Sequence, residues 1–325
     1  MRPVRIIAII ALAFLAVSAK IWPHFLYGAE ALVLVAAGVT LVKPRGVSLS
    51  HLVGAVFFVV ALALTPRAGF AQAESQEFGA TRLDFAVPGG SGFVVRPNRA
   101  ASANSKLWIW YAPTFVKSMP QMGRYPNAAL NWLFTRLLDH GVWLAGVDVG
   151  ESWGNAQGRK AYTNFYKYVR KQYGLSPRPC LIAQSRGGMM LYNWAVEHPH
   201  DVGCVVGIYP VTNLAGWPDL GGNNILQAYG MSAVELRAHL RDNNPIDRLA
   251  PLARAHVPIF HIHGDADKVV PLQPNTLDFV QRYKDLGGTA EVEVIHGKGH
   301  EEVPEFFQSE QVPDFLLRHL SPGAD

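Results

Sequence analysis

Ser185 is the residue of this chain whose surroundings point most directly to chemistry. An apolar run over 180–184 leads into it, and Ala183 and Gly187 place small residues two positions before and two positions after it. A helical pattern begins directly afterwards. A strand, a sharp turn and a helix in this order hold a serine in a strained conformation with its hydroxyl exposed, and the small neighbours are needed because the backbones nearly collide there. The pattern predicts a serine that attacks an acyl carbon.

Such a serine needs a base, and the base needs an acid that orients it. Residues 263–271 (His-Gly-Asp-Ala-Asp-Lys-Val-Val-Pro) follow an apolar strand-like run, and their second carboxylate, Asp267, lies in the loop beyond the strand end. Residues 297–300 (Gly-Lys-Gly-His) follow the next strand and end in His300. The order Ser, Asp, His therefore places each group on a different loop at one end of a sheet.

The elements that must position these groups alternate along the chain. Strands are expected at 81–88, 92–97, 107–112, 142–149, 179–184, 203–209, 258–263 and 290–295, and helices at 127–140, 159–173, 187–198, 232–242, 274–286 and 312–320. Alternation of this kind predicts an α/β fold with a mostly parallel, doubly wound sheet. Ligands of such sheets bind beyond the carboxyl ends of the strands. Residues 210–256, rich in Gly, Asn and Pro, break the rhythm and are predicted to form a small cap insertion at that end.

Over roughly residues 107–320 the chain resembles an α/β-hydrolase. Within that superfamily it is most similar to the dienelactone-hydrolase and prolyl-oligopeptidase-like branch, which includes many bacterial polysaccharide esterases. The resemblance implies a nucleophile at Ser185, an acid at Asp267 in the HGxxDxxVP pattern and a base at His300 in the GxGH pattern. Ala183 stands where glycine is usual, and alanine is small enough to preserve the turn.

Two of the three roles have rivals nearby in the sequence. Asp265 could replace Asp267 as the acid, or it could cap a turn; the family motif favours Asp267. His263 and His296 could replace His300. His263 is expected to be a strand-end residue, and His296 comes four residues early, before the flexible glycine-rich segment.

A tetrahedral intermediate also needs an oxyanion hole. One donor is expected to be the backbone N–H of Arg186, directly after the nucleophile, and the other should come from the loop after strand 107–112. Pro113 has no N–H, which leaves Thr114 or Phe115, and we favour Phe115.

The substrate pocket is expected to surround these donors. The Arg186 side chain would favour a carboxylate-bearing substrate such as a uronate, and glucuronoyl esterases also carry Ser-Arg at this turn; alternatively, the arginine forms a salt bridge within the fold. The other predicted pocket residues follow strand ends: Thr114, Glu151, Trp153, Tyr209 and Trp217. The aromatic members would give walls that bind sugars, although aromatic residues at strand ends also often belong to the core.

Three hydrophobic stretches, at 4–19, 26–42 and 52–64, precede a polar start at Glu74. The third is short for a spanning helix, which wants about 20 apolar residues. Lys43 and Arg45 precede it, and Ala-Gln-Ala at 71–73 fits a small-x-small cleavage signal.

We therefore predict a signal peptide over 42–73 and a catalytic domain over 74–325 that is periplasmic or secreted. Residues 1–41 are then an over-extended start or one or two membrane helices. The alternative is an uncleaved anchor with an extracytoplasmic catalytic domain, in which case the N-terminal segment is the expected contact with a membrane.

The charge balance and the cysteines complete the sequence evidence. The net charge of +4 belongs to residues 1–73, which contain six Lys/Arg and one acidic residue, so 23 basic and 24 acidic residues remain. A near-neutral domain without a basic run argues against a nucleic-acid partner. Cys180 and Cys204 lie in apolar strand-like runs, where a buried free thiol is the commoner state; a disulfide, which export would permit, is the less favoured alternative. No spacing resembles a metal site.

Together these features predict an exported serine hydrolase that cleaves carboxylic esters, with no cofactor and with an ester of a polysaccharide or a small molecule as its substrate. The first alternative is a peptidase of the prolyl-oligopeptidase type. Such peptidases usually carry an N-terminal propeller that limits access, and only about 35 residues of the expected catalytic domain precede strand 107–112, so an enclosed exopeptidase is disfavoured. The second alternative is a catalytically inactive binding module, against which the intact Ser, Asp and His argue.

Overall fold

Nine strands form one sheet in the computed structural model, which describes residues 73–99, 106–114, 126, 128–216 and 224–320. The strands are β1 (Ala73–Glu77), β2 (Ala80–Val87), β3 (Gly90–Arg96), β4 (Trp108–Ala112), β5 (Trp143–Asp148), β6 (Cys180–Gln184), β7 (Cys204–Ile208), β8 (Ile259–Gly264) and β9 (Ala290–Ile295). Their order is β1-β2-β3-β5-β4-β6-β7-β8-β9. From β5 to β9 neighbouring strands pair in parallel, whereas β1, β2 and β3 pair antiparallel. The predicted mostly parallel sheet is confirmed.

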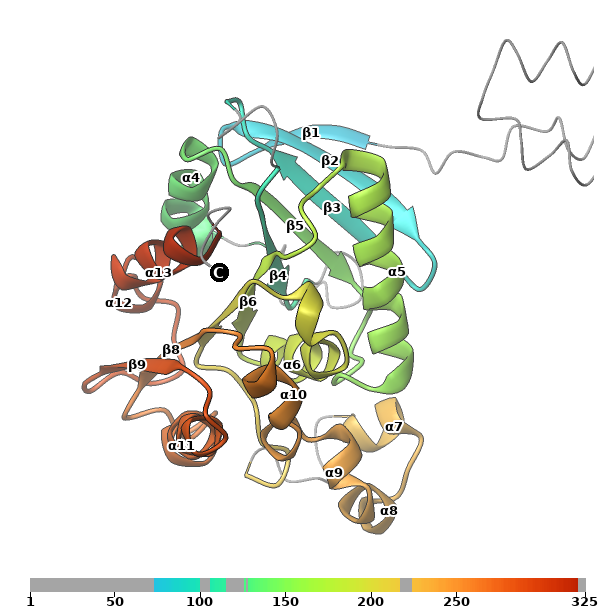
Figure 1. Ribbon diagram of the computed structural model, residues 1–325, viewed down its shortest axis with the longest axis vertical. Coiled ribbons are helices and arrows are strands. Elements are labelled where there is room, and N and C mark those ends of the chain that lie inside the picture. The colour runs from blue at the N-terminus through green and yellow to red at the C-terminus, as the bar shows by residue number, and fades with distance from the viewer. Residues whose placement is uncertain (1–72, 100–105, 115–125, 127, 217–223, 321–325) are drawn as a thin grey trace, which may run out of the picture. The chain divides into compact units, whose positions relative to one another are not determined.

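Helices cover both faces of this sheet (Figure 1). The longer helices are α4 (Asn131–Asp139), α5 (Ala156–Tyr173), α6 (Gly187–Glu197), α11 (Asp278–Asp285) and α13 (Gln311–Leu320). Helices α4 and α13 pack on one face, and α5 and α6 pack on the other. Because both faces are covered, β4 to β8 are buried at every position and read as continuous apolar runs rather than alternating ones.

Short elements account for most differences from the expected pattern. Strand β1 was not predicted, because its sequence is polar and it lies exposed at the sheet edge. The helix expected at 232–242 is two helices, α8 (Ala233–Ala238) and α9 (Leu240–Asn243), which meet at His239. Another short helix, α12 (Pro304–Phe307), precedes α13.

The irregular region between β7 and β8 builds a small layer of its own. It contains α7 (Ile225–Tyr229), α8, α9 and α10 (Ala250–Arg254). The apolar side chains of α7, α8 and α9 belong to a second buried cluster, which also includes residues of the loop after β5 and of α6, whereas those of α10 join the main core. The Tyr229 hydroxyl donates to the Trp153 carbonyl at 2.8 Å, and the Asn155 amide donates to the Ala228 carbonyl at 2.5 Å. These bonds tie the insertion to the loop that follows β5.

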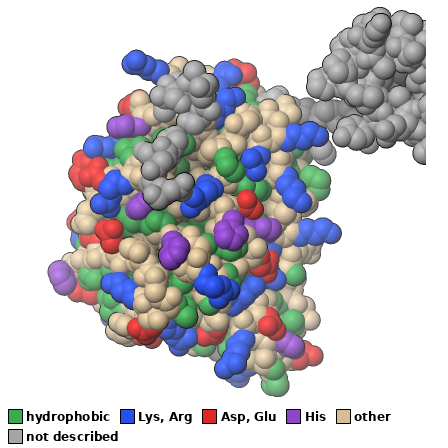
Figure 2. Space-filling view, viewed as in Figure 1, with side chains coloured by type: hydrophobic (Ala, Val, Ile, Leu, Met, Phe, Trp, Pro, Cys, Tyr) green, Lys and Arg blue, Asp and Glu red, His purple; other side chains and the backbone are tan. Residues whose placement is uncertain are grey.

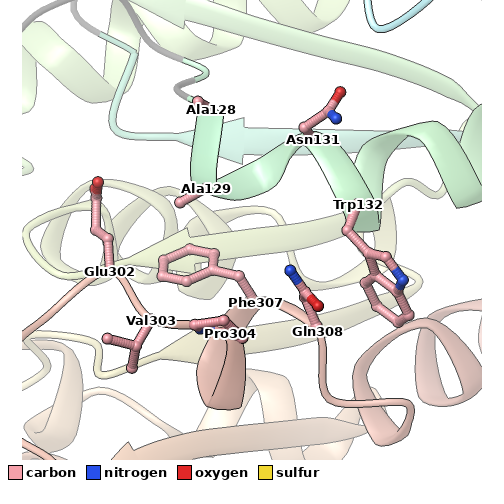
Figure 3. A pocket seen from close by; sticks show the side chains of 9 residues that line it. All are labelled: Ala128, Ala129, Asn131, Trp132, Glu302, Val303, Pro304, Phe307 and Gln308. Carbon is pink, nitrogen blue, oxygen red and sulfur yellow. The ribbon is translucent and has the colours of Figure 1, made fainter.

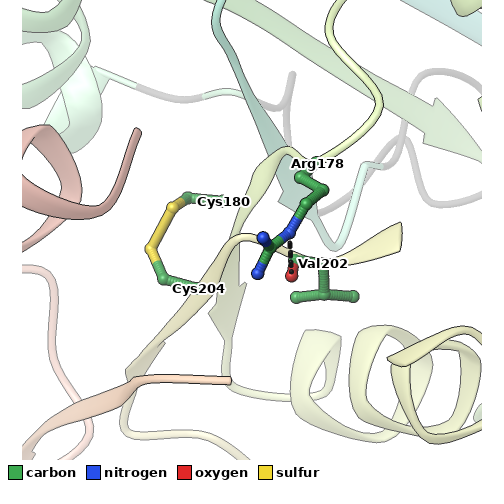
Figure 4. The surroundings of a disulfide bond; sticks show 4 residues. All are labelled: Arg178, Cys180, Val202 and Cys204. Carbon is green, nitrogen blue, oxygen red and sulfur yellow. Dashed lines mark hydrogen bonds between the residues drawn. A yellow bond between two sulfur atoms is a disulfide. The ribbon is translucent and has the colours of Figure 1, made fainter. Parts of the chain in front are cut away.

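Cys180 and Cys204 form a disulfide, so the expectation of free thiols is wrong (Figure 4). The two residues are direct partners in the β6–β7 register, with their Cα atoms 4.5 Å apart. Side chains in register on adjacent parallel strands point to the same face of a sheet, so these two sulfur atoms meet. The register that brings them together is set by the fold and cannot be seen in the sequence.

Lys/Arg and Asp/Glu side chains are interspersed on the face of the molecule shown in Figure 2. This mixture agrees with the near-neutral charge of residues 74–325. Within the described ranges, no helix combines the length and the apolar character that crossing a membrane requires. The predicted signal peptide and residues 1–41 lie outside the described residues.

Candidate active site

Ser185 occupies the turn between β6 and α6 in a left-handed conformation, with a φ of 49°. Its N–H donates to the Ile208 carbonyl at 3.0 Å, so pairing with β7 continues up to the serine before the chain reverses. A side chain at Gly187 would lie 2.1 Å from the Ala112 carbonyl oxygen. Glycine is therefore required there, as the sequence pattern predicts, and the strained φ points the hydroxyl away from the sheet.

The structure brings Ser185, His300 and Asp267 into one hydrogen-bonded row. The Ser185 hydroxyl lies 3.0 Å from Nε2 of His300, and Nδ1 of His300 lies 2.8 Å from Oδ2 of Asp267. Because the carboxylate accepts, Nδ1 carries the proton, and the Nε2 lone pair faces the serine. This is the arrangement in which an imidazole removes a proton from a serine hydroxyl.

Asp267 is held by contacts on both carboxylate oxygens. Its Oδ1 accepts the N–H groups of Val269 and Val270 at 2.9 and 2.8 Å. Burial raises the pKa of Asp267, but hydrogen bonds from His263, His300 and the Val270 N–H outweigh it and hold that pKa well below its usual value. The group therefore stays ionised at neutral pH and can stabilise a protonated His300.

The sequence rivals of the acid and the base lie elsewhere. Asp265 and His296 pair with each other at 2.7 Å, and the His296 side chain is 86% exposed. His263 is fully buried at the end of β8, and its ring nitrogens bind the Thr276 hydroxyl and the Val270 carbonyl. The geometry thus selects Asp267 and His300 from the candidates.

Two of the expected oxyanion donors lie within the described residues. The backbone N–H of Arg186 lies at the amino end of α6, where the helix dipole favours negative charge. Thr114 follows β4 and is buried, and its hydroxyl donates to the Tyr111 carbonyl at 3.2 Å. Phe115, the favoured second donor, lies outside the described residues.

The side chain of Arg186 forms a salt bridge within the fold, as in the alternative interpretation of the sequence. Its guanidinium lies 3.2 Å from Oε2 of Glu151 and 5.8 Å from the ring centroid of Trp153. Burial raises the pKa of Glu151, Arg186 opposes that shift, and Asp148 adds to it. Oε1 of Glu151 is buried and has no hydrogen-bond partner among the described residues. The positive charge beside the nucleophile is therefore already compensated.

The structure contradicts the expectation that aromatic rings form the walls of the substrate pocket. Trp153 and Tyr209 are each 1% exposed, so neither ring presents a face to solvent. Trp153 belongs to the small second cluster, and the Tyr209 ring packs against His300 with 4.3 Å between centroids. Both rings therefore belong to the buried packing around the site and do not line a pocket, because other parts of the chain cover the strand ends that carry them. Trp217 lies outside the described residues.

A pocket that the sequence did not predict lies beside the loop that carries His300 (Figure 3). Its volume is about 210 Å³, and it lies between the start of α4 and the segment that contains α12. The residues that line it are Ala128, Ala129, Asn131, Trp132, Glu302, Val303, Pro304, Phe307 and Gln308. Glu302 follows His300 by two residues, and its Oε1 lies 3.5 Å from the amide of Gln184, the residue before the nucleophile. Two segments that are far apart in the sequence form this pocket, so no single motif predicts it.

No cluster of three or more His, Cys, Asp or Glu side chains suited to a metal ion occurs in the described part of the chain. The chemistry that the site can perform is that of the Ser185–His300–Asp267 row itself: nucleophilic attack, proton transfer and charge stabilisation.

Comparisons with solved structures agree with this fold. The chain is similar to an S-formylglutathione hydrolase from Agrobacterium tumefaciens, with a TM-score of 0.59 and 14% identity over 76% of this chain and 97% of that one. It is also similar to an acylaminoacyl peptidase from Pyrococcus horikoshii (TM-score 0.58, 16% identity, 82% of this chain and 45% of that one). A third is dipeptidyl peptidase 4 from Porphyromonas gingivalis (TM-score 0.57, 13% identity, 77% and 36%). The chain thus spans less than half the length of these two peptidases.

No curated protein sequence matches the chain. The model of the prolyl oligopeptidase family matches residues 150–321, which is more than half of the sequence and includes Ser185, Asp267 and His300. With its α/β-hydrolase sheet, the chain belongs to the prolyl oligopeptidase family of serine hydrolases.

Proposed function

We propose that this serine hydrolase cleaves carboxylic esters, with Ser185 as nucleophile, His300 as general base and acid, and Asp267 as the group that orients His300. The observation that carries the proposal is the continuous row of hydrogen bonds from Ser185 to His300 to Asp267. The φ of 49° at Ser185 supports the same assignment, since strained residues of this kind cluster at active sites.

In the proposed reaction, the Ser185 oxygen attacks the acyl carbon while its proton passes to Nε2 of His300. The N–H of Arg186, with a second donor from the loop after β4, binds the oxyanion. The protonated His300 then gives its proton to the leaving alcohol, and an acyl-enzyme remains. Water attacks this ester with His300 as base, and the acid is released as Ser185 recovers its proton.

The proposed substrate is an ester carried by a polysaccharide or by a small molecule. The pocket beside the loop that carries His300 supports it, because the Trp132 ring and the Asn131 and Gln308 amides suit a hydroxylated ring. The Glu151–Arg186 pair argues against a uronoyl acyl group, since a second carboxylate would meet an arginine that is already neutralised. Acetyl and feruloyl esters are therefore favoured over uronoyl esters.

An ester panel tests this proposal. Purified protein is assayed with acetyl, butyryl, feruloyl and methyl glucuronoyl esters, and in parallel with a peptide nitroanilide; Ser185→Ala is the control. We expect turnover of the esters, with the highest kcat/KM for a neutral acyl group. A higher kcat/KM for the nitroanilide would replace the esterase proposal with a peptidase, and absence of turnover on every substrate would support an inactive binding module.

We also propose that the catalytic domain is exported. The Cys180–Cys204 disulfide supports this proposal, because disulfides persist in oxidising compartments. N-terminal sequencing of the protein recovered from the periplasm or medium is the test, with a start at Glu74 expected. A start well upstream of Glu74 would contradict cleavage and favour the anchored alternative.

A further inference from the structure

A row of polar side chains runs through the core behind the acid. The Tyr192 hydroxyl lies 2.7 Å from Nε2 of His261, and Nδ1 of His261 lies 3.0 Å from the Thr276 hydroxyl. The same hydroxyl lies 2.8 Å from Nδ1 of His263, and Nε2 of His263 lies 2.8 Å from the Val270 carbonyl. The row thus links α6, β8, the segment before α11, and the loop that contains the acid.

Only one assignment of protons satisfies the row with both histidines neutral. The Val270 carbonyl can only accept, so Nε2 of His263 carries a proton and its Nδ1 accepts from the Thr276 hydroxyl. That hydroxyl has one proton to give, so it accepts from Nδ1–H of His261. Nε2 of His261 then accepts from the Tyr192 hydroxyl. Every donor has an acceptor, which is the condition under which buried polar groups are tolerated.

Burial keeps the row in this state. All four side chains are fully buried. Burial, with a smaller contribution from His263, lowers the pKa of His261 to about 3, so His261 stays neutral at physiological pH. Because the Val270 carbonyl can only accept, the His263 N–H at Nε2 points out of the row toward the acid loop.

The row ends at Asp267. Nε2 of His263 lies 3.4 Å from Oδ2 of Asp267, on the same oxygen that accepts from His300. It also binds the carbonyl of Val270, whose N–H donates to Oδ1 of Asp267. His263 thus contacts both ends of the 267–270 turn. The titratable groups in contact with the Asp267 carboxylate, within the described ranges, are His263 and His300.

We propose that His263 is a positioning residue for the reaction: oriented by Thr276, it fixes the 267–270 turn and thereby the direction in which Asp267 holds His300. This inference rests on the proposed function of the Ser185–His300–Asp267 row. A displaced acid would misalign His300, and a misplacement of about 1 Å can cost about 100-fold in rate.

Two matched pairs of variants test the proposal. His263→Leu removes both ring nitrogens, whereas His263→Gln keeps a side-chain N–H that can reach the Val270 carbonyl. Thr276→Val removes the hydroxyl with little change of shape, whereas Thr276→Ser keeps it. Each protein is assayed on a nitrophenyl ester, and kcat is expressed per site labelled to completion by a fluorophosphonate, so that loss of folded protein does not count as loss of rate.

We expect His263→Leu to lower kcat about 100-fold with KM little changed, and His263→Gln to remain within about tenfold of the wild type. Thr276→Val should lower kcat more than Thr276→Ser. Because the contact from His263 lowers the pKa of Asp267, its removal leaves a more basic carboxylate that stabilises protonated His300 better, so activity should be lost at higher pH on acidification of His263→Leu. Equal kcat per labelled site in all four variants, with only stability reduced, would overturn the proposal. Failure of the wild type to turn over ester or to label at Ser185 would instead overturn the proposed function.

Discussion

The two carboxylates near the nucleophile are held in opposite ways. Asp267, after β8, has both oxygens partnered, by two backbone N–H groups on one side and by His300 and His263 on the other. Glu151, after β5, pairs one oxygen with Arg186, and its other oxygen is buried without a partner in the described structure. The contacts lower the pKa of Asp267, and burial raises the pKa of Glu151.

This difference separates the part of the site on which the reaction depends from a part that supports it less directly. The acid side is fixed by four contacts, as expected where a proton must move along one direction. The Glu151 side has one strong contact and packs against the insertion between β7 and β8, through Trp153 and Tyr229. Substitutions on the acid side should therefore lower kcat strongly, and substitutions on the Glu151 side should change it little.

The largest effect is expected for Asp267→Asn. Its amide oxygen would keep the bonds from Val269 and Val270, so the amide N–H₂ group would face His300 and force the proton of His300 onto the wrong nitrogen. We expect kcat on a nitrophenyl ester to fall about 10⁴-fold, as for a triad with the wrong tautomer. Glu151→Gln is the matched control and should retain kcat within about tenfold. Similar losses in the two variants would remove the contrast between the two carboxylates.

A second prediction concerns the stability of the fold as the pH falls. His261 is neutral in the folded state with a pKa of about 3, whereas in the unfolded chain its pKa is about 6.5. Between these values the unfolded state binds one more proton, so acidification destabilises the fold, and the full stability is present above pH 6.5.

Urea unfolding at pH 6, 5 and 4 measures this effect. The free energy of unfolding of the wild type should fall with decreasing pH more steeply than that of His261→Gln, by about 1.4 kcal/mol per pH unit. Parallel slopes for the two proteins would show that His261 is not held neutral by burial.

A smaller effect is expected for Arg186→Met. The guanidinium is partly exposed and already paired with Glu151, so its loss should change kcat/KM by about fivefold or less for neutral and uronoyl esters alike. Rates on butyryl and methyl glucuronoyl esters give the comparison. A loss confined to the glucuronoyl ester would show that Arg186 binds a substrate carboxylate and that the Glu151 side recognises charge.

The smallest effect is expected for the exposed pair of Asp265 and His296. His296→Ala removes the rival base, and an exposed pair contributes little, so kcat and the free energy of unfolding should stay within about twofold and about 1 kcal/mol of the wild type. The His300→Ala variant is the comparison. A large loss of kcat in His296→Ala would mean that His296, and not His300, acts as the base.

The sequence was informative where structure is local. The strand, turn and helix around Ser185, and the loops that carry Asp267 and His300, all lie in short segments with strong patterns. Pairings between distant segments were not predictable in the same way: the Glu151–Arg186 salt bridge, the in-register cysteines and the pocket at Glu302 depend on how loops and strands meet.

Burial was the property that the sequence conveyed least well. Trp153 and Tyr209 follow strand ends and were expected at the surface of a pocket, yet neighbouring elements cover both. The same applies to His263, which the sequence presents as a strand-end residue and the structure places behind the acid. Strand β1 was not predicted because it is exposed rather than buried. An exposed polar edge strand lacks the apolar alternation that marks most strands.

Locating a covalent adduct tests directly whether Ser185 is the nucleophile. The protein is treated with a fluorophosphonate, digested and mapped by mass spectrometry, with Ser185→Ala and His300→Ala treated in parallel. We expect one adduct, on Ser185, which is absent from Ser185→Ala and forms at least about 100-fold more slowly in His300→Ala. An adduct on another residue, or no adduct on a folded protein, would contradict that role of Ser185.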